Sequence, residues 1–240
     1  MIRLAAVTLL LSGSAFASVG KVVKLQGGAT RTSAEGKKEA LAVDAAIELK
    51  DVIEVAAKGA LKLELSDGSV IALDEKSRLE INEADFKGQD VSAFSATLSA
   101  GKLWTKVKKL LGDSKYEVKT QRAVAGVRGT IFRIDADALI KGARGRKADV
   151  VRVIEGTVRV NPSAEVARKS KAAAPAAVAK GPRTQVAAPA EITADEWEKK
   201  FAELQQNQQI AVGIDLWEQA ELDRAALNDR FQKWVEADSK

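Results

Sequence analysis

The stretch LKLELSDGSVIAL, residues Leu61–Leu73, decides the fold class of this chain. In its first five residues, three leucines alternate with Lys62 and Glu64, which places the leucines on one face of a half-buried strand. The next residues, Ser66–Ser69, have the composition of a turn, and the apolar pattern resumes at Val70. The stretch therefore predicts two strands joined by a hairpin turn or by a corner of a coil.

Apolar segments of similar length follow along the chain. They are Leu79–Ile81, Phe94–Leu98, Leu103–Val107, Tyr116–Thr120, Ile131–Ile134, Val150–Ile154 and Val158–Val160. A glycine followed by alternating aliphatic residues recurs at Gly20, Gly101 and Gly156. Short strands after glycine corners predict a mainly β domain over residues 18–161, built as a solenoid-like roll or as a sandwich. We favour the solenoid and leave the sandwich open.

The first residues, Met1–Ala17, have the pattern of a secretory signal peptide. Arg3 gives a positive start, Leu4–Leu11 an apolar core, and Ala15–Ala17 an A-x-A cleavage signature. We expect the mature chain to begin at Ser18 and to be periplasmic or secreted. No stretch is long and apolar enough for a membrane span, so we expect no transmembrane anchor.

After residue 161 the β pattern stops. Residues 162–191 are rich in Ala, Pro and Lys, which predicts a linker without a core of its own. Residues 192–240 then predict an amphipathic helical tail that begins with a capping box at Thr193–Glu196. The candidate helix interface consists of Trp197, Phe201, Leu204, Leu216, Leu227, Phe231 and Trp234. The tail either folds back on the β-domain, pairs with itself as a helical hairpin or coiled coil, or binds a partner.

The composition excludes most kinds of catalysis. The 240 residues include no His and no Cys, which removes the usual triads, thiolate chemistry and the common transition-metal ligands. We therefore expect no cofactor, no metal site and no enzyme activity. A glycan hydrolase that uses paired carboxylates is the remaining enzymatic alternative. Its available acids are Asp51, Asp67, Asp74 and Glu155, each in or beside an expected turn where carboxylates commonly cap backbone amides.

Positive charge is concentrated in the middle of the chain. The net charge is +5, and between Gly101 and Lys147 there are 13 Lys and Arg residues against 4 Asp and Glu. An exported chain does not meet cytosolic nucleic acid, so we expect an envelope protein or an anionic envelope polymer as the partner. The candidate contact patch consists of Lys106, Lys108, Lys109, Arg122, Lys141, Arg144, Arg146 and Lys147.

Three segments together resemble the FecR-type periplasmic domain. They are Asp51–Val70, Thr120–Phe132 with the motif GVRGT, and Val153–Val160. The matching residues are Asp67, Gly68, Ser69, Thr120, Gly126, Val127, Arg128, Gly129, Thr130, Phe132, Glu155 and Gly156. The sequence departs from the family at Lys50 and Gln121, where the family usually carries glycine and proline.

The resemblance implies an extracytoplasmic interaction domain. The signalling members of the family place a cytoplasmic anti-sigma segment and a membrane span before this domain. Here a cleavable signal precedes it, so we do not expect the sigma-factor role.

The GVRGT motif has a physical interpretation of its own. Gly126 and Gly129 allow backbone conformations and close approaches that other residues resist. Thr130 can form a hydrogen bond across the turn, and Phe132 supplies core area. Arg128 either clamps carbonyl groups at the corner, which we favour, or faces solvent as a ligand contact.

The expected function is therefore an exported, non-catalytic binding or scaffold module of the bacterial envelope, with a regulatory role left open. A structural or assembly subunit that forms a homo-oligomer through the tail is the main alternative. The carboxylate-dependent glycan hydrolase is the third.

Overall fold

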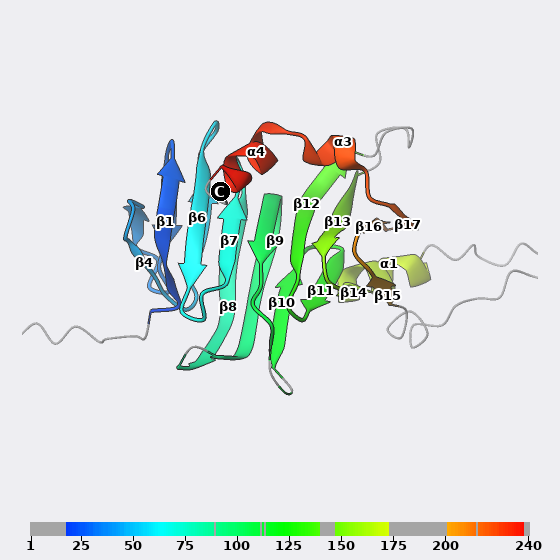
Figure 1. Cartoon of the computed structure of the whole chain (residues 1–240), viewed down its shortest axis with the longest axis horizontal. Coiled ribbons are helices and arrows are strands. Elements are labelled where there is room, and N and C mark those ends of the chain that lie inside the picture. The colour runs from blue at the N-terminus through cyan, green and yellow to red at the C-terminus, as the bar shows by residue number, and fades with distance from the viewer. Residues whose placement is uncertain are drawn as a thin grey trace, which may run out of the picture.

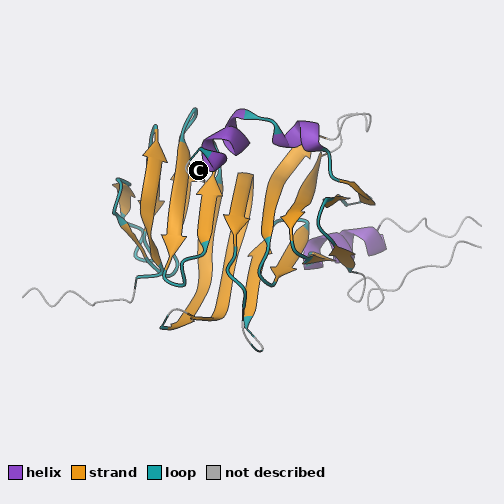
Figure 2. Cartoon of the chain, viewed as in Figure 1, coloured by secondary structure: helices purple, strands orange, loops and turns teal. Residues whose placement is uncertain are grey.

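The computed structural model describes residues 18–88, 90–110, 112, 114–139, 147–172, 201–214 and 216–237. Within these residues the fold is mainly β, as the sequence predicts, and the helices present are few and short (Figure 2). The expected signal peptide, Met1–Ala17, lies outside the described residues. So do residues 173–191 of the expected linker and the capping box at Thr193–Glu196.

Seventeen strands are present in the described residues. The first nine are β1 (Gly20–Gln26), β2 (Ala29–Thr32), β3 (Lys38–Ala40), β4 (Ala46–Ile47), β5 (Val52–Val55), β6 (Ala60–Leu65), β7 (Val70–Leu73), β8 (Arg78–Lys87) and β9 (Asp90–Lys106). The others are β10 (Lys115–Lys119), β11 (Ala123–Val127), β12 (Ile131–Leu139), β13 (Lys147–Glu155), β14 (Val158–Pro162), β15 (Ala202–Leu204), β16 (Gln208–Val212) and β17 (Trp217–Glu221). Every segment expected from its apolar pattern falls within, or extends by one residue beyond, one of these strands.

The stretch that decides the fold forms the expected hairpin. Strands β6 and β7 pair antiparallel with Leu61 opposite Leu73. In the turn between them, Gly68 has a φ of 81°, and the Asp67 carboxylate accepts hydrogen bonds from the backbone N–H and the hydroxyl of Ser69, at 2.9 and 2.5 Å. The left-handed glycine and the capping aspartate fix the register of the two strands.

The strand pairings form two runs that share β9. One run is β4-β1-β6-β7-β9-β12-β13-β16-β17, and the other is β3-β2-β5-β8-β9-β10-β11-β14-β15. Strand β9 pairs with β8 and β10 through its first part and with β7 and β12 through its last six residues. The long strand β9 therefore holds the two runs together, and the sheet as a whole is open.

A single hydrophobic core lies between the two runs. Leu63, Ile71 and Phe132 come from the first run and are 0% exposed. Ile53 and Phe94 come from the second run, are also 0% exposed and belong to the same cluster. Burial of these aliphatic and aromatic side chains stabilises the fold in the absence of disulfide bonds.

The expected helical tail is wrong over residues 202–221. This segment forms β15, β16 and β17, which extend the two runs through β14 and β13. Leu204, Ile210 and Val212 are completely buried and complete the core. Without this segment, β13 and β14 would leave backbone N–H and C=O groups unpaired at the edges of the two runs. Hydrogen bonds to these groups stabilise strands there, although the side chains have a helical spacing.

Helices after residue 201 are short. The described residues contain α3 (Arg224–Leu227) and α4 (Arg230–Glu236) there, of four and seven residues. Of the six candidate helix-interface residues that the structure describes, Leu227, Phe231 and Trp234 lie in helices. Leu204 lies in β15, Leu216 lies between β16 and β17, Phe201 precedes β15, and Trp197 is outside the described residues.

The expected linker begins with a helix rather than with extended chain. Helix α1 (Ala164–Ala172) starts after Ser163, whose hydroxyl accepts a hydrogen bond from the N–H of Val166 at 3.3 Å. Val166 and Ala167 are buried, so this part of residues 162–191 packs on the domain. The N-cap serine and this burial explain the helix in spite of the polar composition.

Gly101 is the position at which β9 passes from one run to the other. Its φ is 85°, and an added Cβ would lie 2.5 Å from the Cα of Ser77. We predict that Gly101→Ala lowers the free energy of unfolding by at least about 2 kcal/mol, because left-handed strain and a backbone clash add.

Gly36 is the matched control, because its φ is 82° but an added Cβ would meet nothing within 4 Å. Gly36→Ala should cost only about 1 kcal/mol in urea unfolding. Equal losses of unfolding free energy in the two variants would show that the close approach of Gly101 to Ser77 does not matter for stability.

Candidate functional site: the sheet face beneath the C-terminal helix

A row of directly paired residues crosses the outer face of the first run. Lys62 is opposite Ala72, Ala72 opposite Trp104, and Trp104 opposite Arg133. The row continues from Arg133 to Arg152 and from there to Gln209. We call these six residues the outer row; they are Lys62, Ala72, Trp104, Arg133, Arg152 and Gln209. Directly opposed residues point to the same side of a sheet, so the row forms one continuous surface.

Helices α3 and α4 cross this surface from β13 towards β7 (Figure 1). The apolar side of α4 buries Phe231 and Val235, each 1% exposed. They form a second hydrophobic cluster with Ala72 and Trp104 of the outer row, separate from the main core. The end of the chain therefore folds back on the β-domain, which is the first of the three arrangements expected for the tail.

Arg133 and Arg152 are directly opposed and almost fully buried, which is unfavourable for two like charges. Asp135 lies between them and accepts from Arg133 Nε at 2.7 Å and from Arg152 Nη1 at 2.6 Å. Asp229, at the start of α4, accepts from Arg133 Nη2 at 2.6 Å and from Nη1 at 3.0 Å. Arg133 thus has one carboxylate partner in the sheet and one in the tail.

The ion pairs continue along α4 to the neighbouring loop. Lys102 Nζ lies 3.1 Å from Asp229 and 3.3 Å from Asp74. Arg230 lies 3.0 Å from Asp74. A chain of four cations and three carboxylates therefore runs over the sheet, with Asp229 at its middle.

Asp229 is held in its charged form. Burial acts to raise the pKa of Asp229, but hydrogen bonds from Arg133 and from the N–H of Gln232 outweigh it and hold the pKa far below its usual range. Burial acts to lower the pKa of Arg133, and Asp229 and Asp135 reverse this effect, so the pKa of Arg133 is raised. Both partners stay ionised at neutral pH.

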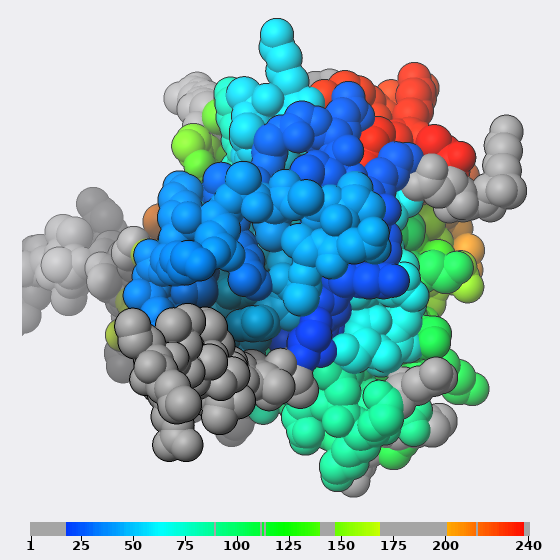
Figure 3. All heavy atoms as spheres, turned by 90° about the vertical axis from the view of Figure 1, so that its left-hand side faces the viewer, coloured from blue at the N-terminus to red at the C-terminus, as the bar shows by residue number. Residues whose placement is uncertain are grey.

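The sheet contacts both ends of α4. Asp229 is the N-cap and accepts from the N–H of Gln232 at 2.9 Å, while Lys62 donates to the carbonyl oxygen of Val235 at 3.1 Å. Lys24 of β1 lies 4.8 Å from the ring centre of Trp234, and Figure 3 shows the C-terminal residues beside the N-terminal strands. A negative cap at the first turn and a cation at the last carbonyls complement the helix dipole.

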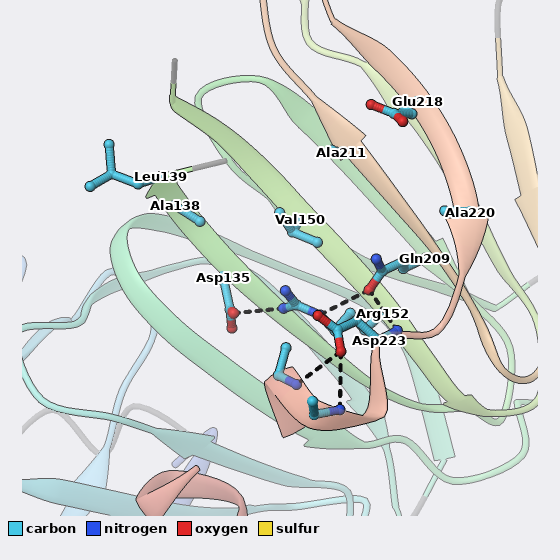
Figure 4. A pocket seen from close by; sticks show the side chains of 12 residues that line it. Asp135, Ala138, Leu139, Val150, Arg152, Gln209, Ala211, Glu218, Ala220 and Asp223 are labelled. Carbon is cyan, nitrogen blue, oxygen red and sulfur yellow. Dashed lines mark hydrogen bonds and ion pairs between the residues drawn. The ribbon is translucent and has the colours of Figure 1, made fainter. Parts of the chain in front are cut away.

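A hollow of about 490 Å³ lies where the outer row reaches α3 (Figure 4). In it, Arg152 donates to Asp135 and, at 3.1 Å, to Gln209. Asp223 accepts from the N–H groups of Ala225 and Ala226 at 3.0 and 3.2 Å. The carboxylates of Asp135 and Asp223 are thus occupied by partners from the chain itself, an arrangement that fits a structural role better than acid–base catalysis.

Three of the four acids considered for hydrolysis also have local partners. Asp51 is paired with Arg31 at 3.3 Å, and Asp67 accepts from Ser69. Asp74 is paired with Lys102 and Arg230, as described above. Glu155, at the end of β13, is exposed.

Across the described segments, no set of three Asp or Glu side chains converges as a metal site would require. No helix of those segments is long and apolar enough to cross a membrane.

The candidate contact patch divides into separate parts. Lys106, the last residue of β9, and Lys108 and Lys109 just after it are exposed. Arg122 is paired with Asp137 and Asp149, and Lys147 with Asp137. These two residues lie towards the far end of β12, because Lys106 is opposite Ile131, the first residue of that strand. Lys141, Arg144 and Arg146 lie outside the described residues.

Several residues of the family motif shape the corner between β11 and β12. Gly129 has a φ of 68°, and Thr130 donates to the carbonyl oxygen of Thr157 at 2.9 Å. Gly156 has a φ of 84°, and an added Cβ there would lie 2.8 Å from the carbonyl oxygen of Gly129. Phe132 is 0% exposed, and Arg128 donates to the carbonyl oxygen of Gly112 at 3.0 Å from an exposed position.

The expectation for Gly126 is wrong. It lies in β11 beside Val127, paired with Arg159 and Glu117, and its φ is not positive. An added Cβ would approach the carbonyl oxygen of Arg159 only to 3.9 Å, an ordinary contact. Thr120, at the end of β10, accepts from the N–H of Ala123 at 2.8 Å and closes the turn.

The central residues of the site were not singled out from the sequence. They are Lys102, Arg133, Asp135, Arg152 and Asp229. One signal was present: in Arg133-Ile134-Asp135, two charges flank an apolar residue within an expected strand, which places both charges on the same face. No local pattern in the sequence indicated that Asp229 belongs to the site, because its partner Arg133 is 96 residues away.

Comparisons with known proteins agree with the resemblance in the sequence. Residues 51–159 match the model of the family described as FecR protein, which confirms the FecR-type domain. The match leaves out β1–β4, although β1 and β2 pair with β6 and β5 inside it. Lys50, where the family usually has glycine, has a φ of 71°, a conformation that glycine adopts without strain. No curated protein matches the chain.

Similar solved structures cover part of the chain. Two crystal structures of a proposed anti-sigma factor from Parabacteroides distasonis ATCC 8503 are 16% and 15% identical, with TM-scores of 0.47 and 0.46. They cover 77% and 78% of this chain and only 62% and 63% of their own. A cell surface anchoring domain is 22% identical, covers 26% of this chain and 83% of its own, and has a TM-score of 0.26.

The ion pairs of Asp229 indicate how the free energy of unfolding depends on pH. Asp229→Asn keeps a good N-cap but removes the charge. We expect the variant to be less stable than the wild type by about 2 kcal/mol at neutral pH, the range for hydrogen bonds to charged groups. Because the pKa of Asp229 is lowered in the folded state, this difference is fully present above the ordinary pKa of about 3.9 and declines as the pH falls below it.

Urea unfolding between pH 7 and pH 2.5 measures this difference. Asp223→Asn is the matched control, since Asp223 caps α3 and has no cation partner in the part of the chain that the structure describes. A difference between Asp229→Asn and wild type that stays constant down to pH 2.5 would contradict the ion pairing.

Proposed function

We propose that this chain, which carries a FecR-family segment at residues 51–159, is an exported, non-catalytic binding module of the bacterial envelope with a regulatory role. The FecR match supports a regulatory module of the envelope. The signal-like pattern of Met1–Ala17 supports export. The pairing of Asp51, Asp67 and Asp74 within the chain supports a role without catalysis.

One observation carries the choice of binding surface. Lys106, Lys108 and Lys109 are exposed, and within the described ranges none of them has an acidic partner, unlike Arg122 and Lys147. The backbone of Lys109 lies against Gly129, which brings these lysines next to the family motif. We call Lys106, Lys108 and Lys109 the corner lysines, and we assign them to the contact with an acidic face of an envelope protein.

The structure gives less support to assembly through the tail. Phe231 and Val235, which would supply the apolar contact, are buried against the chain's own sheet. A homo-oligomer through α4 would first have to give up this packing. We therefore place the binding surface on the β-domain.

A photo-crosslinking amino acid at position 108, in cells that produce the chain, tests the proposal. We expect one discrete adduct with an envelope protein, and none from the same amino acid at Lys87, which is exposed on β8. Lys106→Glu with Lys109→Glu should reduce the adduct at least about tenfold, because charge reversal slows association with an acidic face.

Lys37→Glu with Lys58→Glu is the control, since both lysines are exposed and lie in other turns, between β2 and β3 and between β5 and β6. This pair should leave the adduct unchanged. Equal adducts from positions 108 and 87 would refute the proposal, and a heterogeneous, protease-resistant adduct would assign the surface to an anionic polymer.

A further inference from the structure

We infer that the outer row and its surroundings form a docking groove for an amphipathic helix of the partner protein, and that α4 occupies this groove when the partner is absent. This inference deepens the proposed binding function, because it names the structural element that the partner brings. The groove is lined by Ala72, Trp104 and Arg133, with Lys62 and Lys102 at its two ends.

The groove already shows how it recognises a helix. Lys102 and Arg133 hold the carboxylate of the residue before the first turn, Asp229. Phe231 and Val235, four residues apart on one side of the helix, fill the apolar floor. These contacts fix an acidic cap and an apolar i, i+4 pair as the features that any helix needs to bind here.

Helix α4 satisfies the groove incompletely. Four buried side-chain polar atoms lack a hydrogen-bond partner in the described part of the chain, and two of them lie at the α4 interface: Trp104 Nε1 and Gln232 Oε1. An unmade hydrogen bond at a buried atom costs free energy, so an occupant that offers an acceptor to Trp104 binds better than α4 does. A second copy of this chain offers only the same α4 and gains nothing at this atom.

The length of α4 also makes it replaceable. It has seven residues, below the roughly 12–15 at which a helix is stable in water without packing. The preceding α3 has no buried residue. Helix α4 therefore depends on the groove for its structure and can leave it without disrupting the main core.

The groove extends beyond the last turn of α4. A hollow of about 620 Å³ opens beside Val235 and is lined by Val23, Val70, Trp104 and three lysines, Lys24, Lys62 and Lys106. Lys106 is also one of the corner lysines. A longer helix with an acidic residue near its C-terminal end would therefore fill the hollow and reach the proposed contact surface. This geometry favours a partner helix of acidic, amphipathic character.

A labelled peptide of residues 223–240 provides a defined probe, and its binding to the full-length chain is measured by fluorescence anisotropy. Phe231→Ala in the chain weakens the resident helix and should tighten peptide binding at least about tenfold, because the probe then competes with a poorer occupant. Gln232→Met in the chain removes the unpaired acceptor and one hydrogen bond to Glu236, whose exposed carboxylate water can solvate instead. The net effect should strengthen the resident helix and weaken peptide binding.

Asp229→Asn within the peptide is the matched control and should lose at least about tenfold in affinity for the Phe231→Ala chain. Circular dichroism of each chain checks that the β-domain stays folded, and Val235→Ala in the chain gives a second variant that weakens the resident helix and leaves the groove unchanged. Equal binding of both peptides, or no binding to any variant, would overturn the inference. A wild-type dimer held by exchanged α4 helices would overturn the assignment to a partner protein.

The assay uses no partner protein, so its result does not depend on the crosslinking at position 108. A groove that rejects the peptide would leave the contact surface of the corner lysines in place. A groove that accepts the peptide, without an adduct at position 108, would place the partner on the groove alone.

Discussion

The pairing of Arg133 with Asp229 is the interaction on which the arrangement of the chain depends. Arg133 is 1% exposed, and a guanidinium so deeply buried is strongly destabilising without carboxylate partners. The sheet provides Asp135, but that carboxylate is shared with Arg152. The second carboxylate comes from the tail, so the charge on β12 requires the end of the chain to fold back over the sheet.

This requirement links the fold to the proposed function. The strands β15–β17 extend both runs and carry the chain to the side of the sheet where α3 and α4 cross it. Helix α4 then covers an aromatic and cationic surface that would otherwise face solvent. A surface of this kind, closed by a short helix of the same chain, is a suitable site for a regulated contact, because the partner and the tail compete for the same charges and the same apolar floor.

The sequence predicted the β-domain well and the tail poorly. The alternating leucines of Leu61–Leu65 and the glycine corners predicted strands, because these signals depend on local spacing and backbone conformation. The helical spacing of Leu204 and Leu216 was misleading, since pairing with β13 and β14 decided the structure of residues 202–221. The site could be predicted only in part: the corner lysines stood out by composition, whereas the contact of Asp229 with Arg133 depends on a long-range fold that no local pattern encodes.

A double-mutant cycle between Arg133→Met and Asp229→Asn, measured by urea unfolding at neutral pH, tests the central pairing most directly. The account predicts a coupling free energy of at least about 1 kcal/mol, with the double variant more stable than the sum of the two single losses implies. Additive losses, with no coupling between the two positions, would show that the tail is placed by its apolar side alone and would contradict the account.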